Sequence, residues 1–253
     1  MKIIKNLRFY IILFYCCICV IFISLFFSGC KSAPILLAEH SPAAIVSVLS
    51  NPTIPWIDEG DRDDEEDDGE GILSVTVNKF LGRNNPEILT AADRLLYAEE
   101  SFHSLFSEIA DTELLDKDVV LSSKTFKSLK AGIFSSFETE IAAEGYLKIY
   151  GLGAKSARIL MEELNAKSLI FVTFKFNKKR SSANKWSGSV YAVAQMSVKV
   201  LDNRGKEIIN KDYTVTSTQT TPLLNRKYDR DALVDMFPEL IDYLITRFIV
   251  DYM

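Results

Sequence analysis

A long run with an apolar residue at every second position, in the last third of the sequence, constrains the fold of this chain most strongly. Between Trp186 and Leu201 every second residue from Val190 onward is apolar, which gives an extended segment one continuous apolar face. Asp202-Asn203-Arg204-Gly205 is a turn signal, and Glu207–Ser217 alternates again. The pattern predicts a long hairpin whose apolar face other elements must cover. That face consists of Val190, Ala192, Ala194, Met196, Val198 and Val200.

The remaining periodicities predict the other strands and the helices. Leu169–Phe176 is apolar on both faces at its start, which is typical of a central strand. A helix with an amphipathic face is predicted from about Asp229, restarted at Pro238, and we expect it to pack on the sheet rather than on a membrane. We therefore predict an α/β (α+β) fold, a mixed, largely antiparallel sheet of about five strands with helices packed on it and a C-terminal amphipathic helix. Further strands are predicted at Ile72–Phe80 and Val119–Leu121, and further helices at 85–110, 123–129, 138–149 and 154–165.

The first thirty residues are typical of an export signal. Lys2, Lys5 and Arg8 precede the run Phe9–Phe27, which contains no charged residue. A positive segment, an apolar segment and small residues before a cleavage site make a secretion signal. The alternative is an uncleaved transmembrane anchor, because the apolar run is close to the ~20 residues that cross a bilayer. In either case the rest of the chain faces away from the cytoplasm.

The end of this segment, Phe27-Ser28-Gly29-Cys30, resembles the lipobox of bacterial lipoproteins. The resemblance implies cleavage after Gly29 and covalent lipid, diacylglycerol with further acyl chains such as palmitate, on Cys30. Phe27 departs from the usual leucine, and looser boxes of this kind resemble those of spirochaete lipoproteins. Several acyl chains anchor a protein stably in a membrane. We expect a lipid-anchored protein of the cell envelope, at the outer membrane or cell surface rather than the inner membrane, and no cofactor besides the lipid.

Charge and proline content divide the rest of the chain. Residues 30–70 are predicted to be a lipidated tether, proline-rich at first, with one short ordered piece around Ala43–Leu49. It ends in an acidic linker, residues 58–70, which holds ten acids and one base and lacks the spacing of a calcium-binding loop. Residues 71–253 are predicted to be a single domain, with 24 Lys/Arg, 23 Asp/Glu and no cysteine. This near-neutral balance argues against a broad nucleic-acid footprint, and the lack of cysteine excludes disulfides there.

The second half of the chain, about residues 154–253, resembles the domain of small envelope lipoproteins related to the curli secretion lipoprotein. The resemblance is carried by the helix-to-strand segment Glu163–Phe174, the hairpin turn Leu201–Lys206 and the closing amphipathic helix. It implies a periplasmic binding or assembly module. No pore-forming insertion is evident, so pore formation is not carried over.

A glycine turn at Gly151-Leu152-Gly153 precedes a predicted helix and allows three interpretations. A dinucleotide-binding turn would use the glycines to admit phosphates to a helix N-terminus, but no acid follows about 20 residues on. A helix-hairpin-helix over residues 150–160 would present backbone amides to DNA phosphates, with weak, salt-sensitive binding from a single copy. The third interpretation, an ordinary turn before a helix, is the one that we favour.

Asn177–Gly188 is a basic stretch with one tryptophan, predicted to be a loop between strands. It could contact lipid headgroups, peptidoglycan or the acidic surface of another protein, or it could be a solvated connection. The candidate contact residues are Lys178, Lys179, Arg180, Lys185 and Trp186.

Nothing in the pattern indicates an enzyme. His103 follows Glu99 by one helical turn, but two ligands are too few for a metal site, and no nucleophile elbow accompanies the scattered serines. We predict a non-enzymatic interaction or assembly module of the envelope whose partners are a membrane, through the lipid, and another envelope protein. The alternatives are a lipoprotein that holds a small or apolar ligand between sheet and helices, and an exported DNA binder through residues 150–160. The sequence predicts no metal site and no oligomeric state.

Overall fold

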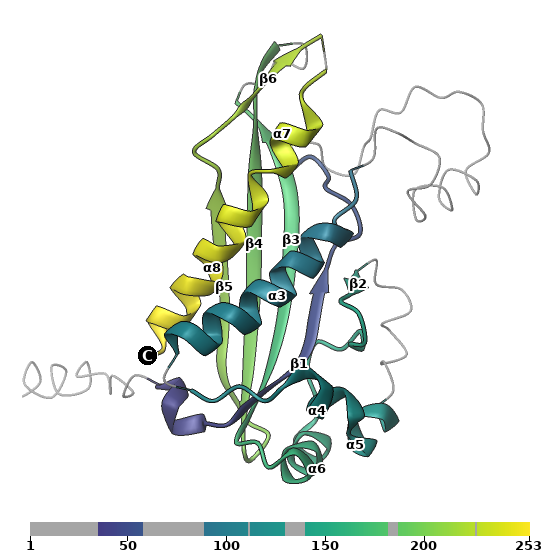
Figure 1. Cartoon of the computed structure of the whole chain (residues 1–253), viewed down its shortest axis with the longest axis vertical. Helices are drawn as coiled ribbons and strands as arrows, with labels where there is room; N and C mark the ends of the chain where they lie inside the picture. The colour runs from purple at the N-terminus through teal and green to yellow at the C-terminus, as the bar shows by residue number, and fades with distance from the viewer. Residues whose placement is uncertain (1–34, 58–88, 111, 130–139, 182–186, 226) are drawn as a thin grey trace, which may run out of the picture. The chain divides into compact units, whose positions relative to one another are not determined.

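The computed structural model describes residues 35–57, 89–110, 112–129, 140–181, 187–225 and 227–253 (Figure 1). Within them, Ile35–Met253 forms one compact unit. Gly29, Cys30, the acidic linker and the predicted strand Ile72–Phe80 lie outside the described residues, so the predictions made for them stay predictions.

The core of the unit is a mixed sheet. Its strands follow the order β2-β1-β3-β4-β5, and β6 pairs with β4 beyond the end of β5. Only β1 and β3 run parallel; the other pairs are antiparallel. The predicted fold class is thus confirmed, with six strands in place of about five. The strands are β1 (Ala43–Ser50), β2 (Ile141–Ala142), β3 (Ser168–Arg180), β4 (Ser187–Asp202), β5 (Glu207–Thr216) and β6 (Thr221–Leu224).

β1 is part of the sheet and not of a tether. All eight of its residues are buried, and it lies between β2 and β3 in the sheet order. The chain then continues along the edge of β3: the Asn51 side chain donates to the Phe176 carbonyl at 2.7 Å and accepts from the Phe176 amide at 2.8 Å. The ordered piece predicted around Ala43–Leu49 is thus confirmed, but its assignment to a tether is wrong, because it is a strand of the sheet. Flanking prolines suggested a linker, whereas AAIVSVLS is a short apolar run of the kind that a strand buried on both faces needs.

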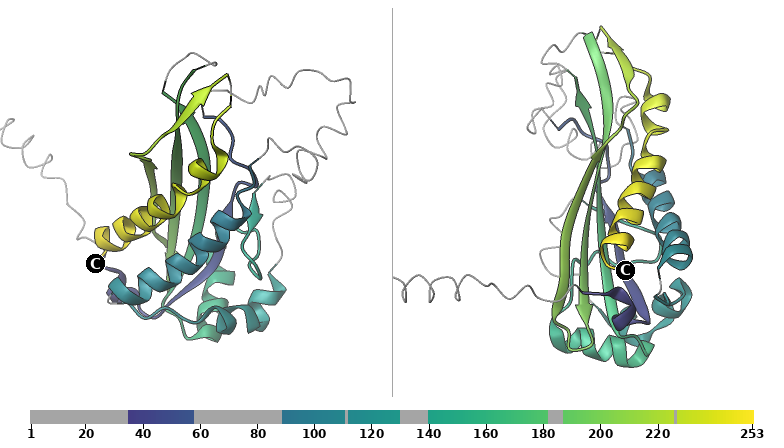
Figure 2. Two further views of the ribbon diagram at one scale, coloured as in Figure 1. Left: turned by 45° about the horizontal axis from the view of Figure 1, so that its top comes forward. Right: turned by 90° about the vertical axis from the view of Figure 1, so that its left-hand side faces the viewer.

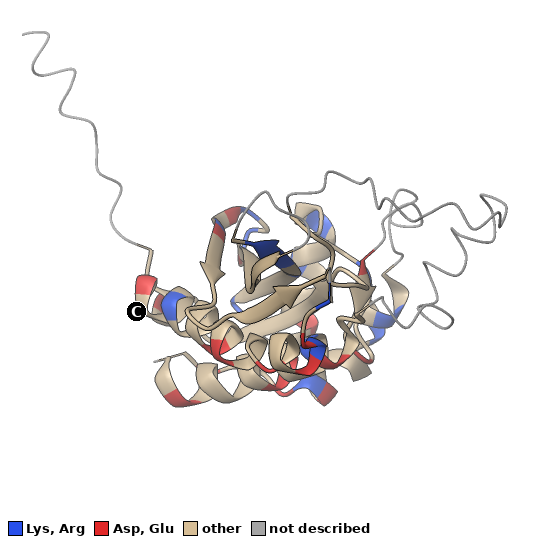
Figure 3. Cartoon of the chain, turned by 90° about the horizontal axis from the view of Figure 1, so that it is seen from above, with Lys and Arg blue, Asp and Glu red and all other residues tan. Residues whose placement is uncertain are grey.

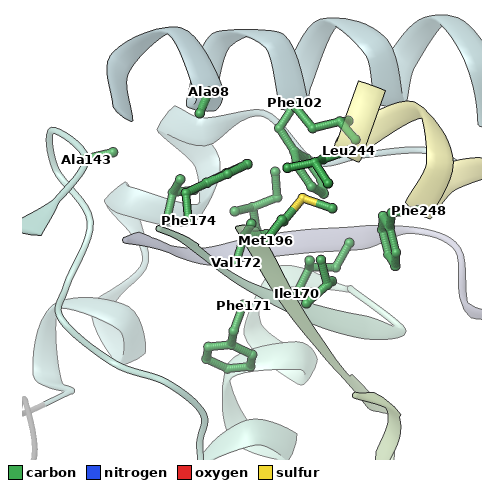
Figure 4. Packing of buried hydrophobic residues seen from close by; sticks show 14 of the residues in the cluster. Ala98, Phe102, Ala143, Ile170, Phe171, Val172, Phe174, Met196, Leu244 and Phe248 are labelled. Carbon is green, nitrogen blue, oxygen red and sulfur yellow. The ribbon is translucent and has the colours of Figure 1, made fainter. Parts of the chain in front are cut away.

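Two long helices, α3 (Ala92–Ile109) and α8 (Phe237–Asp251), cover one face of the sheet (Figure 2). Aromatic side chains fill the space between the layers: Phe176 meets Phe237 at 5.4 Å between ring centroids, and Phe102 meets Phe248 at 6.1 Å. Figure 4 shows Phe102, Phe174, Met196 and Leu244 converging there, with Phe171 on the opposite side of the sheet. The amphipathic C-terminal helix packs on the sheet, as predicted. Pro238 stands in its first turn, where proline is tolerated, and the short helix α7 (Arg230–Val234) precedes it.

Three short helices lie near one end of the sheet: α4 (Lys117–Ser122), α5 (Lys124–Ser128) and α6 (Ala154–Leu164), while the 3₁₀ turn η1 (Leu37–His40) precedes β1 (Figure 1). The predicted strand Val119–Leu121 is wrong, because these residues form α4 and bury only Val120. The predicted helix 138–149 is also wrong over its described part, which contains β2 and turns. In both segments a few apolar residues matched a period by chance, and tertiary contacts decided the conformation. No helix among the described residues is long and apolar enough to cross a membrane.

Candidate interaction surface

The predicted basic loop is mostly strand. β3 extends to Arg180, so Lys178, Lys179 and Arg180 occupy its last three positions, and successive side chains point to opposite faces. Lys185 and Trp186 lie outside the described residues. The three cations therefore do not form one contact surface, and each face must be considered separately.

Lys178 and Arg180 point to the helix-covered side, where two aromatic rings hold them. The Lys178 ammonium lies 4.9 Å from the Trp56 ring centroid and 5.5 Å from that of Tyr228, and the Arg180 guanidinium lies 4.1 Å from the Trp56 ring. The Trp56 and Tyr228 rings meet edge to face at 5.7 Å. Lys178 is only 7% exposed, which removes it from the available surface. These four residues form what we call the aromatic clasp.

The aromatic clasp fastens the segment after β1 to the end of β3. The Lys178 amide donates to the Pro55 carbonyl at 2.9 Å, and the Ile57 amide donates to the Lys178 carbonyl at 3.0 Å. Cation–π contacts of partly desolvated cations add to these backbone bonds. Sequence reasoning missed Trp56 because the tether prediction removed it from the domain. A tryptophan in a proline-rich segment was the signal that could have found it.

Lys179 points to the other face of the sheet, which no long helix covers (Figure 2). α6 contacts β3 at one end of this face, where Leu169 and Phe171 are buried. Beyond Phe171 the face turns polar, and Lys175 and Lys179 are exposed. We call this polar part the open face. It consists of Lys175, Asn177, Lys179, Tyr191, Gln195, Ser197, Lys199, Asn210, Asp212 and Thr214.

The two sides of the domain differ in charge. β3 carries four cations and no acid, whereas the helix layer exposes more acids than bases (Figure 3). Lys199 on the open face is paired with Glu207 at 3.4 Å, but Lys175 and Lys179 have no salt-bridge partner among the described residues. The open face is therefore polar and weakly basic at its β3 side. The exposed acids of the helix layer are Asp93, Glu100, Glu108, Glu239 and Asp251.

The glycine turn at residues 151–153 packs against the β4–β5 hairpin. Gly205 has φ of +74°, and a Cβ there would lie 2.6 Å from the Ala154 Cα, so the hairpin turn touches the start of α6. The described residues 140–153 contain no helix, so the first helix of a helix-hairpin-helix is missing and the DNA-binding interpretation of residues 150–160 is wrong. No strand leads directly into the turn either, as a dinucleotide site requires. A shallow hollow of about 410 Å³ adjoins it, lined by Tyr150, Gly151, Leu152, Lys199, Leu201, Gly205 and Glu207.

His103 belongs to a half-buried polar cluster beside the middle of α3. Glu99, buried, pairs with the Lys117 ammonium at 2.7 Å, and His103 Nε2 lies 3.2 Å from the Tyr146 hydroxyl. Burial lowers the pKa of His103 and raises that of Tyr146. The Lys117 ammonium also lies 5.3 Å from the Tyr146 ring centroid, so Lys117 contacts both Glu99 and Tyr146. The described residues contain no group of three His, Cys, Asp or Glu that could bind a metal ion.

β5, the strand at the end of the order β2-β1-β3-β4-β5, has a free outer edge. Six of its ten residues are exposed, and no described strand pairs with its outer side. At its C-terminal end a second hollow, of about 260 Å³, opens between the strand and α8. Its lining residues are Val215, Thr216, Ser217, Thr218, Gln219, Met236, Glu239, Leu240 and Tyr243.

Comparison with known protein families and with curated proteins gives no match. Among solved structures, the C-terminal domain of LpoB from Salmonella enterica is similar at 10% identity and a TM-score of 0.31, over 74% of this chain and 86% of that one. Lipoprotein GNA1162 from Neisseria meningitidis is similar at 13% identity and a TM-score of 0.29, over 80% and 98%. The hypothetical protein CT253 from Chlamydia trachomatis is similar at 12% identity and a TM-score of 0.34, over 83% of this chain and 94% of that one. At such scores these likenesses carry no argument about function.

Proposed function

We propose that this chain is a lipid-anchored envelope protein that acts by binding another envelope protein and not by catalysis. The observation that carries the proposal is the asymmetry of the sheet: one face is sealed by α3 and α8, while the open face and the β5 edge are polar and uncovered by helices. Such a surface offers hydrogen-bonding groups and cations to a partner. Export and anchoring are inferred from residues 1–30, with Cys30 as the lipidated residue.

The packing favours protein binding over storage of an apolar ligand. A ligand held between sheet and helices needs a cavity there, and aromatic side chains fill that layer instead. Phe102, Phe106, Phe174, Phe176, Phe237 and Phe248 are all fully buried in it. The two hollows described above lie at the hairpin and at the sheet edge and are both open to solvent.

Site-specific photo-crosslinking in intact cells tests the binding surface. A photoreactive amino acid replaces Lys179 on the open face in one variant and Glu100 on the helix layer in a matched control, both at exposed positions. We expect one discrete crosslinked protein from position 179 and none from position 100. Crosslinking of equal yield at both positions, or at neither, contradicts the proposal.

Mass spectrometry of the N-terminal peptide from membranes tests the anchor separately. An acylated peptide that begins at Cys30 supports it, and a Cys30→Ala variant should then lose the acyl mass and accumulate uncleaved. An intact peptide spanning residues 1–30 in the unmodified chain contradicts cleavage and lipidation, and the apolar run would then be a membrane anchor.

A further inference from the structure

The free edge of β5 has the backbone chemistry to accept another strand. β6, which follows it in the chain, pairs with Ser187–Val190 of β4 and so does not extend along β5. Ser217 ends the pairing by donating its amide to the Ala192 carbonyl at 2.8 Å and accepting the Ala192 amide on its hydroxyl at 3.0 Å. An edge strand presents alternate unpaired N–H and C=O groups, which are a template for pairing with another chain.

The hollow at the end of β5 has an apolar floor and a polar rim. Val215, Met236 and Leu240 supply the apolar lining, and Thr216, Thr218, Gln219 and Glu239 surround it. Tyr243 contributes a large side chain that is 51% exposed, although α8 buries most of its apolar residues against the sheet. A half-exposed aromatic ring beside a shallow apolar pocket is the kind of place where one apolar side chain of a partner anchors.

Two exposed cations lie along the same side of the edge. Lys211 stands between Ile209 and Tyr213, both buried against the helix layer, and alternation therefore places it on the helix side of β5. Arg247 lies on α8 one turn after Tyr243, with its guanidinium 5.8 Å from the Tyr213 ring centroid. Neither cation has an ion pair with any described residue. Asp251 supplies one carboxylate here, since it accepts from the Tyr213 hydroxyl at 3.1 Å. The two cations still outnumber it, so this stretch of the edge is complementary to a further carboxylate.

We infer that the β5 edge binds an extended segment of a partner protein as an added strand, with an apolar side chain in the hollow beside Val215 and an acidic side chain beside Lys211. The inference rests on the proposed function and names the chemistry of the partner. Val215 and Lys211 are four residues apart on one face, so the apolar and acidic residues of the partner must also be four apart. In antiparallel pairing the apolar residue comes first, and in parallel pairing the acidic one does.

A second copy of this chain fits the edge poorly. β5 contains two acids, and neither faces the helix side: Asp212 bonds to Ser197 on the open face, and Glu207 is held by Lys199 and Asn210. Two β5 edges brought together would thus offer Lys211 no carboxylate from the facing strand, and their four cations would outnumber the two Asp251 carboxylates that bond to Tyr213. The edge favours a different, acidic segment.

Synthetic heptapeptides can test this directly on the full-length protein in detergent micelles. In Thr-Phe-Thr-Val-Thr-Glu-Thr the phenylalanine and glutamate share one face, four residues apart, in the order for antiparallel pairing. The reversed sequence, Thr-Glu-Thr-Val-Thr-Phe-Thr, has the order for parallel pairing. The control Thr-Phe-Thr-Val-Glu-Thr-Thr has the same composition but places the glutamate on the opposite face. Binding is followed by fluorescence anisotropy of a labelled peptide.

We expect one of the first two peptides to bind more tightly than the control by a factor of up to about five, since an exposed ion pair contributes up to ~1 kcal/mol. A version methylated on alternate backbone nitrogens should lose binding, because it cannot complete the ladder. Val215→Asp should weaken binding about tenfold or more, because it places a charged side chain in the apolar hollow that binds the phenylalanine. Equal binding of all three peptides, or none, overturns the inference.

Charge exchange separates the proposed contact from a general effect of positive charge. Lys211→Glu should lower the affinity for the glutamate peptide. A peptide with lysine in place of that glutamate should bind the Lys211→Glu variant with the original affinity. Lys127→Glu, at an exposed position on α5 and outside both the open face and the β5 edge, is the matched control and should change neither affinity. If Lys127→Glu has the same effect as Lys211→Glu, the edge is not the site. Crosslinks from Lys179 together with a failure of all peptides would retain the proposed function and reject only this inference.

Discussion

The two faces of the sheet arise from the same strands, and in the second half of β3 they alternate residue by residue. Phe174 and Phe176 point into the helix layer and are fully buried, whereas Lys175 between them is exposed on the open face. The helix side is held by aromatic packing and by two helices that together shut out water. The open side has no aromatic layer of this kind among the described residues, and cross-strand neighbours contribute to its stability. The comparison teaches that stability is concentrated on one face, which leaves the other free for contact.

Substitutions at two neighbouring positions of β3 should show the largest difference in the free energy of unfolding. Phe176→Ala removes a fully buried ring that packs on Phe174 and Phe237 and should lower the free energy of unfolding by about 3–5 kcal/mol. Lys175→Ala, one residue away on the open face, should change it by less than about 0.5 kcal/mol. Urea denaturation followed by circular dichroism measures both. Similar losses for the two variants would mean that the open face is covered in solution.

The ion pair between Glu99 on α3 and Lys117 on α4 should give the next largest effect. Glu99→Ala leaves the Lys117 ammonium without its carboxylate in a half-buried site and should cost about 2–4 kcal/mol. Asp93, on the same helix, lies 3.7 Å from Arg94 with its side chain 80% exposed. Asp93→Ala is therefore the control, with an expected change below about 0.5 kcal/mol. A small loss for Glu99→Ala would show that water reaches this end of the helix layer.

A glycine pair tests whether the hairpin turn and α6 are packed as described. Gly205→Ala forces an alanine into a positive φ and brings its Cβ into collision with Ala154. We therefore expect the free energy of unfolding to fall by about 1–3 kcal/mol. Gly153→Ala adds a Cβ with no atom within 4 Å and should be nearly neutral. Thermal unfolding of the two variants gives the comparison. Equal melting temperatures would place the turn away from the helix in solution.

The smallest expected effect concerns pH. Burial lowers the pKa of His103 in the folded state, so the unfolded chain takes up this proton first. His103 should therefore contribute full stability above its unfolded pKa of about 6.5 and progressively less as pH falls through that value toward its lower folded pKa. His103→Gln should flatten this part of the curve, measured as urea midpoints at several pH values between 5 and 8. An unchanged slope in the variant would assign the dependence to other groups.

Glu163 provides the opposite case in a lower pH range. The carboxylate accepts the backbone amides of Thr125 and Lys124, which hold the start of α5, and these bonds lower its pKa to about 2. Stability from this group is present above its unfolded pKa of 4.5 and is lost as pH falls toward 2. The two residues should therefore affect stability in separate pH ranges, which one titration of both single variants can resolve.

Local periodicity was sufficient for the elements with long, regular patterns. The hairpin Glu207–Ser217 and its turn, the helix at 154–165 and the C-terminal helix were predicted within a few residues of their observed bounds. Short segments failed, because three apolar residues at Val119–Leu121 match a strand and a helix equally well. The contact prediction is wrong at Lys178 for another reason: the basic composition of the segment indicated a surface, and only the fold shows that Trp56 and Tyr228 cover this side chain.

The sequence by itself determined the period of each long element and which of its faces is apolar, because side-chain spacing along a strand or helix follows from backbone geometry alone. It also determined the charge distribution and the pattern of the first thirty residues, which read directly from residue order. Only the tertiary structure decided that Ala43–Ser50 enters the sheet, that Lys178 and Lys179 part to opposite faces, and that β5 ends the sheet with a free edge. These are pairings between segments far apart in the chain, and no local pattern specifies which apolar strand becomes the neighbour of another.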